Sequence, residues 1–594
     1  MSFRDDTHDS PEAKRRFILS DHWFTTWDGT RLFYRAWRPQ VPSGRILVLF
    51  HRGHEHSGRW DDVVEAIAPE GFTVFAWDAR GNGRSEGPRD DADNFGWYAR
   101  DAELFVRHLS ETERVPEDQI AVVGHSVGAA IVTAWLHDYA PRIRAAVLAT
   151  PAFRIRLYLP LAIPALRLAQ KLGIMTTVPS YVKARVLTHD RTQQMRHERD
   201  QLITHAISTR VLIDLHDTAT RLIDDAAAIR VSTLVLVAGS DWVVKQSVQK
   251  RFFDRLGSAV KHLESLPGSY HDVYHELNAG RALRITRDFI DAAFTAPATL
   301  PALVDADERG YTFDEYRALS RPLPRLSLKW IGYTVFGLFL RTLGRLSAGI
   351  RLGWETGFNS GRMLDYVYRN RPDGVTPLGR FIDRQYLNGI GWRGIRVRRQ
   401  LLERAVQQAI HQTHAAKGSV HVVDIAAGTG RYLLETLKRC ERMCVTAELR
   451  DMEAANLEHA RTLAEGFGLE RVAYVKGDAF DRCALAGLSP RPDIAVVSGL
   501  YELFPDNAKV SSSLQGLAQA IPEGGTLIYT NQPWHPQLEL IARGLSNWDG
   551  KPWIMRRRTQ AEMDELVSAA GFEKMRMEID QWGMFTVSLA RRVS

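Results

Sequence analysis

Gly124-His125-Ser126-Val127-Gly128 is the run of residues with the clearest capacity for chemistry. It follows the apolar stretch Ile120–Val123 and precedes the small and apolar residues 129–134. A Gly-x-Ser-x-Gly run between a strand and a helix makes a turn so tight that only glycine fits two residues either side of the serine. The turn holds the hydroxyl at the helix N-terminus. The run therefore predicts that Ser126 is a nucleophile.

A serine nucleophile needs a base to take its proton and a carboxylate to orient that base. Asp241 follows the apolar stretch Thr233–Ala238, at a point where an acid in a loop can reach inward. His271 follows a Pro-Gly-Ser turn, and His275 is the alternative base. We prefer His271 because the turn fixes its position, whereas His275 starts a helical turn. The predicted catalytic set is Ser126, Asp241 and His271.

The loop His51–Ser57 follows a predicted strand at Arg45–Phe50 and can offer a backbone N–H group to an oxyanion. The residue after the nucleophile, Val127, supplies the second N–H group. The loop holds three histidines, at positions 51, 54 and 56. Their spacing does not favour a metal site, and we predict none.

A second set of chemically informative residues follows three predicted strands in the last third of the chain. Small residues after the strand Val420–Ile425 let a backbone approach a ligand closely, and acids at the strand ends can hold ribose hydroxyls or an adenine amine. We prefer Asp451 to Glu448 as the ribose acid, because a helix begins directly after it. The predicted cofactor residues are Asp424, Ala426, Gly428, Gly430, Asp451, Asp478 and Ala479.

Polar residues among aromatics follow the next two predicted strands, at Asp493–Ser498 and Thr526–Thr530. Tyr501, Glu502 and His535 lie where an acceptor substrate would sit. Structural packing is an equally good interpretation of each one.

The elements that position these residues alternate between strands and helices. In the first half, short strands are predicted at 31–35, 45–50, 73–77, 120–124, 145–148 and 233–238, with amphipathic helical stretches between them. The second half adds strands at 420–425, 444–449, 472–476, 493–498 and 526–530. This pattern predicts an α/β protein with two doubly wound domains.

Three segments follow from this pattern. Residues 1–295 form the first domain, with a helical cap at about 151–229 where strand signals vanish. Residues 296–352 are a linker and a basic amphipathic helix, and residues 353–594 form the second domain. A chain of 594 residues is too long for one hydrophobic core, which agrees with this division.

Composition favours a soluble protein from a reducing compartment. Apolar residues make up 45% and charged residues 25% of the chain, as in globular proteins. The three cysteines lack metal-ligand spacing, which favours a cytoplasmic location. We expect no signal peptide, because Met1–Ser20 is polar, and no spanning helix, because no run of about 18 apolar residues occurs.

Positive charge is concentrated between Arg321 and Arg404, with sixteen Lys or Arg against five Asp or Glu. Within it, Lys329–Arg351 has an apolar, aromatic face at helical spacing with basic residues outside that face. Such a helix can lie on an anionic membrane surface at the inner face of the membrane, or pack against the adjoining domain. Nucleic acid is disfavoured as a partner because no reader motif accompanies the charge.

The first half resembles the monoacylglycerol lipase and lysophospholipase group of α/β-hydrolases, through the runs at 51–59, 78–85, 124–128, 241 and 271–276. The resemblance implies an α/β-hydrolase fold, the Ser126–His271–Asp241 triad, an oxyanion hole from the N–H groups of Gly53 and Val127, and a monoacyl lipid ester as substrate. The group usually has His-Gly-x-Gly where this chain has His51-Arg52-Gly53-His54. Arg52 therefore either favours an anionic headgroup or is a solvated surface residue.

The second half, from about Gly353 to Arg592, resembles class I S-adenosylmethionine-dependent methyltransferases, with a Rossmann-like fold. The runs at 499–507 and 532–537 are similar to a methyltransferase family of unassigned substrate, which is known in bacterial fusions with α/β-hydrolases. The resemblance implies S-adenosylmethionine as cofactor. Ala426 departs from the pattern, which has glycine there, and tightens the pocket.

These observations predict a bifunctional enzyme that cleaves a lipid ester and transfers a methyl group to an acceptor that the sequence does not identify. One alternative makes the second half a non-catalytic module that binds lipid or a partner. Another has Ser126 pass its acyl group to an acceptor other than water. A peptidase is a further option on this scaffold, with no sequence feature in its favour.

Overall fold

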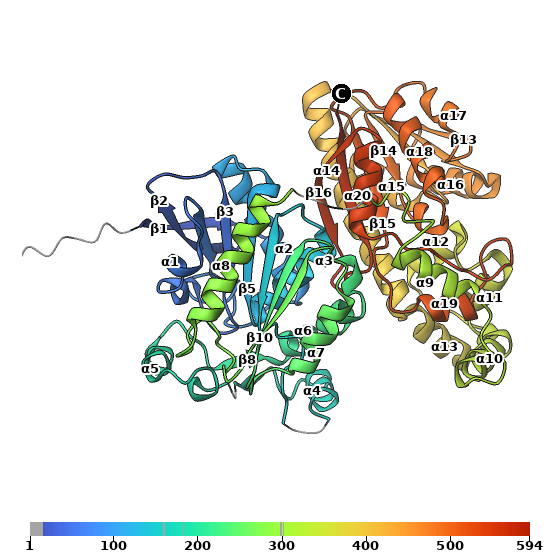
Figure 1. Ribbon diagram of the computed structural model, residues 1–594. Coiled ribbons are helices and arrows are strands. Elements are labelled where there is room, and N and C mark those ends of the chain that lie inside the picture. Colours follow the sequence, from blue (N-terminus) through green and yellow to red (C-terminus); the bar gives the residue numbers. More distant parts are fainter. Residues whose placement is uncertain (1–15, 159–160, 181, 298–299, 301, 594) are drawn as a thin grey trace, which may run out of the picture. The chain divides into compact units, whose positions relative to one another are not determined.

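Buried apolar strands form the centre of the first half of the chain. The computed structural model describes residues 16–158, 161–180, 182–297, 300 and 302–593, in two units: Met1–Leu300 (unit 1) and Pro301–Ser594 (unit 2) (Figure 1). The sheet of unit 1 has the order β1-β2-β4-β3-β5-β6-β9-β10. Its strands are β1 Phe17–Thr25, β2 Arg31–Pro39, β3 Ile46–Phe50, β4 Thr73–Trp77, β5 Ile120–His125, β6 Ala145–Ala149, β9 Ser232–Ala238 and β10 Lys261–Leu266.

Parallel pairing runs from β4 to β10, and β1 and β2 add an antiparallel edge. The six strands predicted in this half are confirmed. The sequence analysis missed β1 and β10, because both are edge strands with polar residues interspersed among the apolar ones. Parallel pairing places the carboxyl ends of β3 and β5 side by side, with Phe50 opposite Gly124.

Helices cover both faces of this sheet, as a buried parallel sheet requires. Alternate strand residues, such as Leu47, Val74 and Val123, pack with the face formed by α1 and α8. Helices α2 and α3 pack together elsewhere in the unit (Figure 1). The main helices are α1 Val64–Ile67, α2 Gly96–Glu113, α3 Val127–Tyr139, α7 Gln246–Arg255 and α8 Gly280–Thr295.

The segment between β6 and β9 is mainly helical, as expected for a cap. It contains α4 Ala162–Lys171, α5 Arg191–Arg199 and α6 Thr209–Asp224. A two-stranded antiparallel pair, β7 Thr177–Pro179 and β8 Ala206–Ser208, was not predicted, because three residues are too few for a periodic signal.

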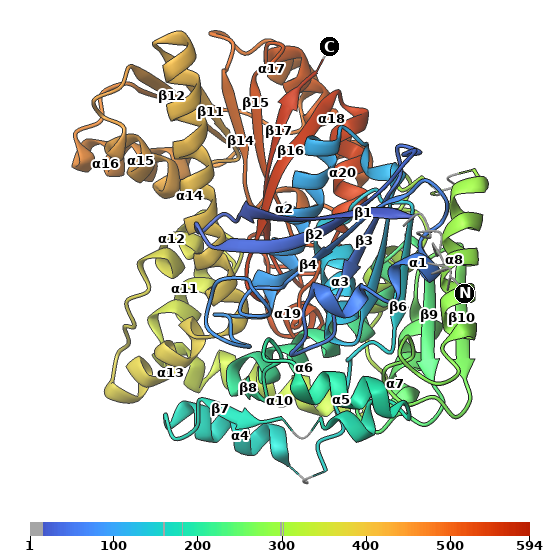
Figure 2. The same ribbon diagram turned by 90° about the vertical axis from the view of Figure 1, so that its left-hand side faces the viewer.

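Unit 2 is built on a second doubly wound sheet, with the order β13-β12-β11-β14-β15-β17-β16 (Figure 2). The five predicted strands are confirmed and pair in parallel, and the antiparallel strands β17 and β16 complete the sheet. Strand order reverses between β11 and β14, which is where ligands bind in such sheets. The strands are β11 Val420–Ile425, β12 Val445–Asp451, β13 Val472–Lys476, β14 Ile494–Val497, β15 Thr526–Asn531, β16 Phe572–Ile579 and β17 Thr586–Arg592.

The helices of unit 2 fall into two groups. Those that accompany the sheet are α14 Ile390–Lys417, α15 Arg431–Arg439, α16 Ala454–Phe467, α17 Arg482–Ala486, α18 Asn507–Ala520 and α20 Gln560–Ala569. The others are α9 Tyr311–Ser320, α10 Leu328–Arg341, α11 Ala348–Thr356, α12 Gly361–Arg369, α13 Pro377–Leu387 and α19 Leu538–Gly544. Short 3-10 turns lie at Ser57–Trp60, Glu117–Gln119, Ala184–Val186, Ala226–Ala228, Leu343–Leu346 and Tyr501–Leu503.

From residue 302 onward, the segment predicted as a linker is folded into unit 2, whereas its described residues 296, 297 and 300 belong to unit 1. The carboxylate of Asp307 accepts a hydrogen bond from the Asn507 N–H at 2.6 Å, and the Leu303 N–H donates to Glu565 at 2.9 Å. The sequence analysis read the Pro, Ala and Asp content of this segment as a linker, but these tertiary hydrogen bonds hold it against the sheet domain.

The prediction of one continuous basic amphipathic helix over Lys329–Arg351 is wrong. Helix α10 ends at Arg341, a 3-10 turn follows, and α11 begins at Ala348. Thr342 leaves the helical region with a ψ of −95°, and the Ser347 side chain caps α11 by accepting from the Ile350 N–H. No helix in the described part of the chain is both long and apolar enough to cross a bilayer.

The buried carboxylate of Asp383, on α13, ties together the turns around α11, α12 and α13. It accepts hydrogen bonds from the Ser347 hydroxyl at 2.5 Å, the Gly349 N–H at 2.9 Å, the Tyr366 hydroxyl at 2.5 Å and the Asp373 N–H at 2.9 Å. Its replacement leaves four donors without this acceptor.

We expect Asp383→Ala to lower the free energy of unfolding of unit 2 by about 3 kcal/mol or more, because hydrogen bonds to a buried charged group are worth roughly 1.5–3 kcal/mol each. A thermal melt of the full chain measures the effect. The exposed carboxylate of Glu470 offers the control, and Glu470→Ala should leave the midpoint unchanged. Equal midpoints for the two variants would contradict this role for Asp383.

Candidate active sites

The turn at Ser126 is as tight as the sequence predicts. Ser126 lies between β5 and α3 with a φ of 55°, a conformation that costs a non-glycine residue energy. A Cβ on Gly124 would lie 2.7 Å from the Ala129 Cα, and one on Gly128 would lie 2.4 Å from the His51 carbonyl oxygen. Glycine at both positions therefore lets α3 begin directly against β3 and β5.

The structure brings the three predicted catalytic side chains together. His271 Nε2 lies 2.7 Å from Ser126 Oγ, and His271 Nδ1 lies 2.9 Å from Asp241 Oδ2. All three residues are buried. Asp241 Oδ1 also accepts from the N–H groups of Val243 and Val244, at 2.8 and 2.9 Å. Burial alone would raise the pKa of Asp241, but His271 and these N–H groups hold it below its usual range.

His275, the alternative base, is engaged elsewhere. Its Nδ1 lies 3.0 Å from Asp272 and its Nε2 lies 3.2 Å from Asp62. Burial opposes the charge on this ring, yet the two carboxylates raise its pKa to about 9. A ring that is protonated at neutral pH cannot accept a proton from a serine, which leaves His271 as the base within reach.

The oxyanion loop lies directly against the start of α3. A Cβ on Gly53 would lie 2.9 Å from the Val127 side chain, so the two predicted N–H donors belong to adjacent pieces of backbone. His54, where the resembling group has glycine, has a φ of 70°, and its Nδ1 lies 2.8 Å from Asp90. The conformation explains why glycine is usual at that position.

The interpretation of Arg52 as a solvated surface residue is wrong. Its guanidinium is buried and pairs with Glu55 at 2.5 Å and with Asp272 at 3.4 Å. Arg52 also lines the cavity above Ser126, and its preference for an anionic headgroup stays a prediction. Arg52 links the oxyanion loop to the loop of His271, because Asp272 is the next residue.

The three loop histidines have separate partners. His51 Nε2 accepts from the Ala79 N–H at 2.9 Å, His54 contacts Asp90, and His56 Nε2 lies 2.9 Å from Asp200. Among the described residues, no group of three His, Cys, Asp or Glu side chains is arranged to hold a metal ion.

A mainly apolar cavity of about 490 Å³ opens above Ser126. Its wall includes the catalytic residues Ser126 and His271 and the oxyanion-hole residues Gly53 and Val127. Residues of the cap form much of the remaining wall. The cap residues include Leu157, Ala162, Leu166, Val178, Ile207 and Leu215. The cavity has the size and polarity of a site for an apolar small molecule.

In unit 2, the predicted cofactor loop connects β11 to α15. Ala426, Gly428 and Gly430 have φ values of 55°, 59° and 63°. A Cβ on Gly430 would lie 2.2 Å from a methyl group of Leu449, whereas one on Gly428 would meet only Gly361 Cα, at 3.5 Å. Ala426 thus adopts the left-handed conformation that glycine favours, which explains why the resembling family has glycine there.

The predicted ribose acid, Asp451, holds this loop. Its Oδ2 accepts from the Gly428 N–H at 2.8 Å, and its Oδ1 accepts from the Glu453 N–H at 2.9 Å and from Asn456 at 3.1 Å. Oδ2, which accepts a single hydrogen bond, retains further accepting capacity. Glu448, the alternative, pairs with Arg450 at 2.5 Å. Asp478 is exposed at the end of β13 beside the buried Ala479.

Asp424 is the strongest sign that this edge of the sheet takes a polar ligand. It is completely buried, and neither carboxylate oxygen has a well-formed hydrogen bond among the described residues. Burial raises the pKa of Asp424 to about 8, against the opposing effect of the Tyr432 hydroxyl. Unsatisfied buried carboxylates are rare in native structures. The donor groups of an amino-acid or nucleoside ligand fit this arrangement.

Two of the three predicted acceptor residues line a second cavity, of about 410 Å³, beyond the ends of β14 and β15. They are Glu502 and His535, and Gln532 joins them. Tyr501 lies outside this wall, and its hydroxyl lies 3.0 Å from Ser513 Oγ. Its burial therefore reflects packing.

Sequence reasoning missed Arg398, which pairs with Glu502 at 3.0 Å inside this cavity. Burial raises the pKa of Glu502, and the neighbouring Arg398 opposes that shift. The sequence shows Arg398 only as one of four arginines within residues 393–399. Their charge alone does not indicate which of them is buried.

His535 presents a donor to the cavity. Its Nδ1 accepts from the Gln537 N–H at 3.1 Å, which assigns the proton to Nε2. Burial lowers the pKa of His535 to about 4, so the ring is neutral at pH 7.

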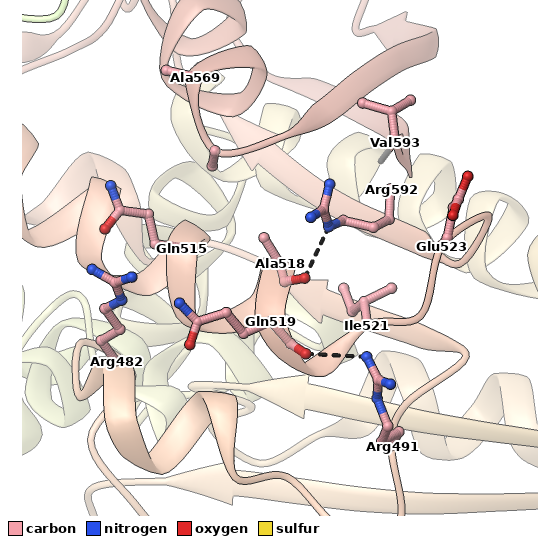
Figure 3. A pocket seen from close by; sticks show the side chains of 11 residues that line it. Arg482, Arg491, Gln515, Ala518, Gln519, Ile521, Glu523, Ala569, Arg592 and Val593 are labelled. Atoms are coloured by element: carbon pink, nitrogen blue, oxygen red, sulfur yellow. Dashed lines mark hydrogen bonds between the residues drawn. The ribbon is translucent and has the colours of Figure 1, made fainter.

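A surface depression between α17, α18 and β17 has a different character (Figure 3). Arg491 and Arg592 donate to the carbonyl oxygens of Gln519 and Ala518, near the C-terminal end of α18. Basic groups there satisfy the free carbonyls of the helix. The depression lies at the amino ends of β14 and β15, away from the cofactor edge, and we assign no ligand to it.

Two protein-family models match the chain in tandem. One, described as "Serine aminopeptidase, S33", matches residues 42–278, and the other, described as "Putative methyltransferase", matches residues 286–592. The chain belongs to this methyltransferase family. It joins the family's domain to an α/β-hydrolase domain similar to monoglyceride lipases, and the predicted fusion is thereby confirmed.

One similar protein matches nearly the whole chain, and two others match less than half of it. "Uncharacterized protein YnbC" of Escherichia coli (strain K12) is 46% identical over 579 residues, which are 97% of this chain and 99% of that protein. "Monoacylglycerol lipase" of Mycolicibacterium smegmatis is 28% identical over 262 residues, 43% of this chain and 91% of that protein. "Phospholipase YtpA" of Bacillus subtilis (strain 168) is 23% identical over 263 residues, 43% of this chain and 98% of that protein.

The raised pKa of Asp424 predicts a pH-dependent stability. Below about pH 4 the acid is protonated in both states, and between pH 4 and about 8 only the unfolded chain loses the proton. The free energy of unfolding should therefore fall as pH rises through this window, by up to about 1.4 kcal/mol per pH unit from this group.

The variant Asp424→Asn removes this dependence, and its stability relative to the parent chain should rise from pH 4 to pH 8 and then level off. Urea denaturation of both proteins across this range measures the difference. A constant difference between them would contradict the burial of an uncompensated acid.

Proposed function

We propose that unit 1 is a serine hydrolase that cleaves the carboxylic ester of a monoacyl lipid, either a monoacylglycerol or a lysophospholipid. The observation that carries the proposal is the hydrogen-bonded line from Asp241 through His271 to Ser126, at the floor of an apolar cavity. The lipase and phospholipase names of the relatives support the substrate class.

In this mechanism Ser126 Oγ attacks the ester carbonyl carbon while His271 Nε2 takes the hydroxyl proton. The N–H groups of Gly53 and Val127 stabilise the oxyanion. His271 then gives the proton to the leaving alcohol, and an acyl-serine remains. In the second half, His271 takes a proton from water, whose oxygen attacks the acyl carbon. The bond to Ser126 Oγ then breaks, the fatty acid leaves, and His271 returns the proton to Ser126. Asp241 accepts the Nδ1–H of His271 and stabilises the charge that develops on the ring.

We also propose that unit 2 is an S-adenosylmethionine-dependent methyltransferase. The cofactor supplies an electrophilic methyl group when bound. Asp451 would accept hydrogen bonds from its ribose hydroxyls, Asp478 from its adenine amine, and the loop from Asp424 to Gly430 would border its amino-acid portion. Glu502 and His535 would orient the acceptor at the adjoining strand ends.

Replacing Ser126 tests the hydrolase. We expect Ser126→Ala to lower turnover of a short p-nitrophenyl ester by about 10⁴-fold or more, because the nucleophile and base act as a unit. Ser43→Ala, at an exposed position, is the control and should retain full turnover. Undiminished hydrolysis by Ser126→Ala would sink the assignment, and product analysis with added alcohols would reveal acyl transfer to an acceptor other than water.

Titration calorimetry with S-adenosylmethionine tests unit 2. Asp451→Asn should weaken binding about tenfold or more, because it removes a charged acceptor worth about 1.5–3 kcal/mol. Glu453→Ala, which removes an exposed carboxylate two residues away, should bind like the parent chain. Absence of binding by the parent chain would favour a non-catalytic module.

A further inference from the structure

The cavity of unit 2 has one polar end and mainly apolar walls elsewhere. At the polar end, Glu502 Oε2 and Gln532 Nε2 are buried and have no hydrogen-bond partner among the described residues. Both line the cavity beside Gly499, which follows β14 at the cofactor edge of the sheet. A hydroxyl or amine of a ligand can donate to Glu502 and accept from Gln532 or His535.

Apolar side chains of four helices form most of the rest of the wall, which also includes Asn359, Gln385 and Gln537. Phe336, Phe339 and Leu340 come from α10, Ile382 from α13, Ile395 from α14 and Ile541 from α19. A binding cavity with this asymmetry matches an amphiphile, whose polar group lies at the strand ends and whose hydrocarbon chain lies between the helices.

Helices α10 and α13, which line the cavity, lie at one end of unit 2 (Figure 1). Phe339 and Phe381 line the cavity and are nevertheless exposed, at 38% and 58%. A ligand can therefore enter between exposed aromatic rings.

Helix α10 has a wide apolar face, of which the cavity covers only part. Leu328, Ile331, Val335 and Leu338 recur at helical spacing and are 89%, 43%, 62% and 63% exposed. They adjoin the cavity-lining residues, since Val335 and Phe339 are one helical turn apart. A wide, exposed apolar face on a basic helix can lie in the interface of a bilayer.

The charge around α10 specifies the occupant of this face. Between Glu315 and Glu355 the chain has seven Lys or Arg and no Asp or Glu. Glu539 pairs with Lys329, and α13 adds the exposed Arg380 and Arg384 beside Phe381. Apolar residues among basic ones match the surface of an anionic bilayer, into which the apolar side chains insert while the basic groups contact headgroups.

We propose that the methyl acceptor of unit 2 is a membrane lipid, whose hydrocarbon chain enters the cavity from an anionic bilayer surface on which α10 lies. The inference rests on the proposed methyltransferase function, which it supplies with a class of acceptor. Glu502, Gln532 and His535 then hydrogen-bond the polar group of the lipid, and the apolar side chains of the helices contact its hydrocarbon chain.

Flotation of the full chain with vesicles tests the bilayer contact. Binding should be stronger to vesicles of phosphatidylglycerol and phosphatidylcholine than to phosphatidylcholine alone, and salt should weaken it. The double variant Val335→Asp/Leu338→Asp should lower binding about tenfold or more. The control Ile18→Asp/Leu277→Asp changes two similarly exposed apolar residues and should bind normally. Normal binding by the α10 variant, or equal binding to both vesicle types, would overturn this contact.

Photolabelling tests the cavity. A lysophosphatidylglycerol with a diazirine in its acyl chain, applied to Ser126→Ala so that it is not cleaved, should label peptides of α13 and α14. Ile395→Trp fills the cavity and Phe381→Asp makes its mouth polar, and each should lower this labelling about tenfold while labelling of unit 1 persists. Ile390→Trp, outside the cavity wall, is the control. Labelling of α13 and α14 that resists both cavity variants would overturn the proposal.

Calorimetry with S-adenosylmethionine on the same variants separates this proposal from the methyltransferase assignment and reports folding of Ile395→Trp. Cofactor binding without cavity labelling would overturn the lipid acceptor and leave the methyltransferase standing. Labelling without cofactor binding in the parent chain would make unit 2 a lipid-binding module, and lipid as methyl acceptor would fall with the methyltransferase.

Discussion

Parallel pairing of buried strands is the constraint on which both halves of this protein depend. Parallel strands end at one edge of a sheet, and each must turn there into a helix or loop. Residues far apart in the chain, such as Ser126 after β5 and Asp241 after β9, are thereby brought to one edge. The same constraint places Asp424, Gly499 and Gln532 at one edge of the second sheet. The chemistry of each unit follows from the polar residues at the carboxyl ends of its parallel strands.

The two edges differ in how their buried polar groups are satisfied. In unit 1, Arg52, Glu55, Asp272 and His275 form a network in which charges are paired. This network holds the oxyanion loop against the loop of His271. In unit 2, Glu502 and Gln532 have polar atoms without partners among the described residues, and the buried Asp424 has the Tyr432 hydroxyl as a poorly aligned donor. A paired network preserves a preformed site, whereas unpaired buried atoms are costly until a ligand satisfies them.

Apolar cavities adjoin both edges, and each is bounded by helices outside the sheet. The cap lines the cavity of unit 1 with apolar side chains, and helices α10 and α13 do so in unit 2. Polar side chains at the strand ends line the other part of each cavity. This arrangement suits substrates with a small reactive group and a larger hydrocarbon part.

The sequence was sufficient for the strands that are apolar throughout, for the turn at Ser126 and for the identity of Asp241 and His271, because short-range sterics and chain order decide them. It was insufficient for the edge strands β1, β10 and β16 and for the neighbouring β17, whose alternating or polar composition resembles that of loops. It also joined α10 and α11 into one helix, because hydrophobic periodicity continues across the break at Thr342.

Only the tertiary structure decided which charged residues are buried and with whom. Arg52 pairs with Asp272 and Arg398 with Glu502 across long stretches of chain, and nothing in their local sequence separates them from solvated arginines. The cavity walls were equally hidden, because helices distant in sequence enclose them. Burial and pairing depend on the packing of remote segments, whereas local turns and strand periodicity depend only on neighbouring residues.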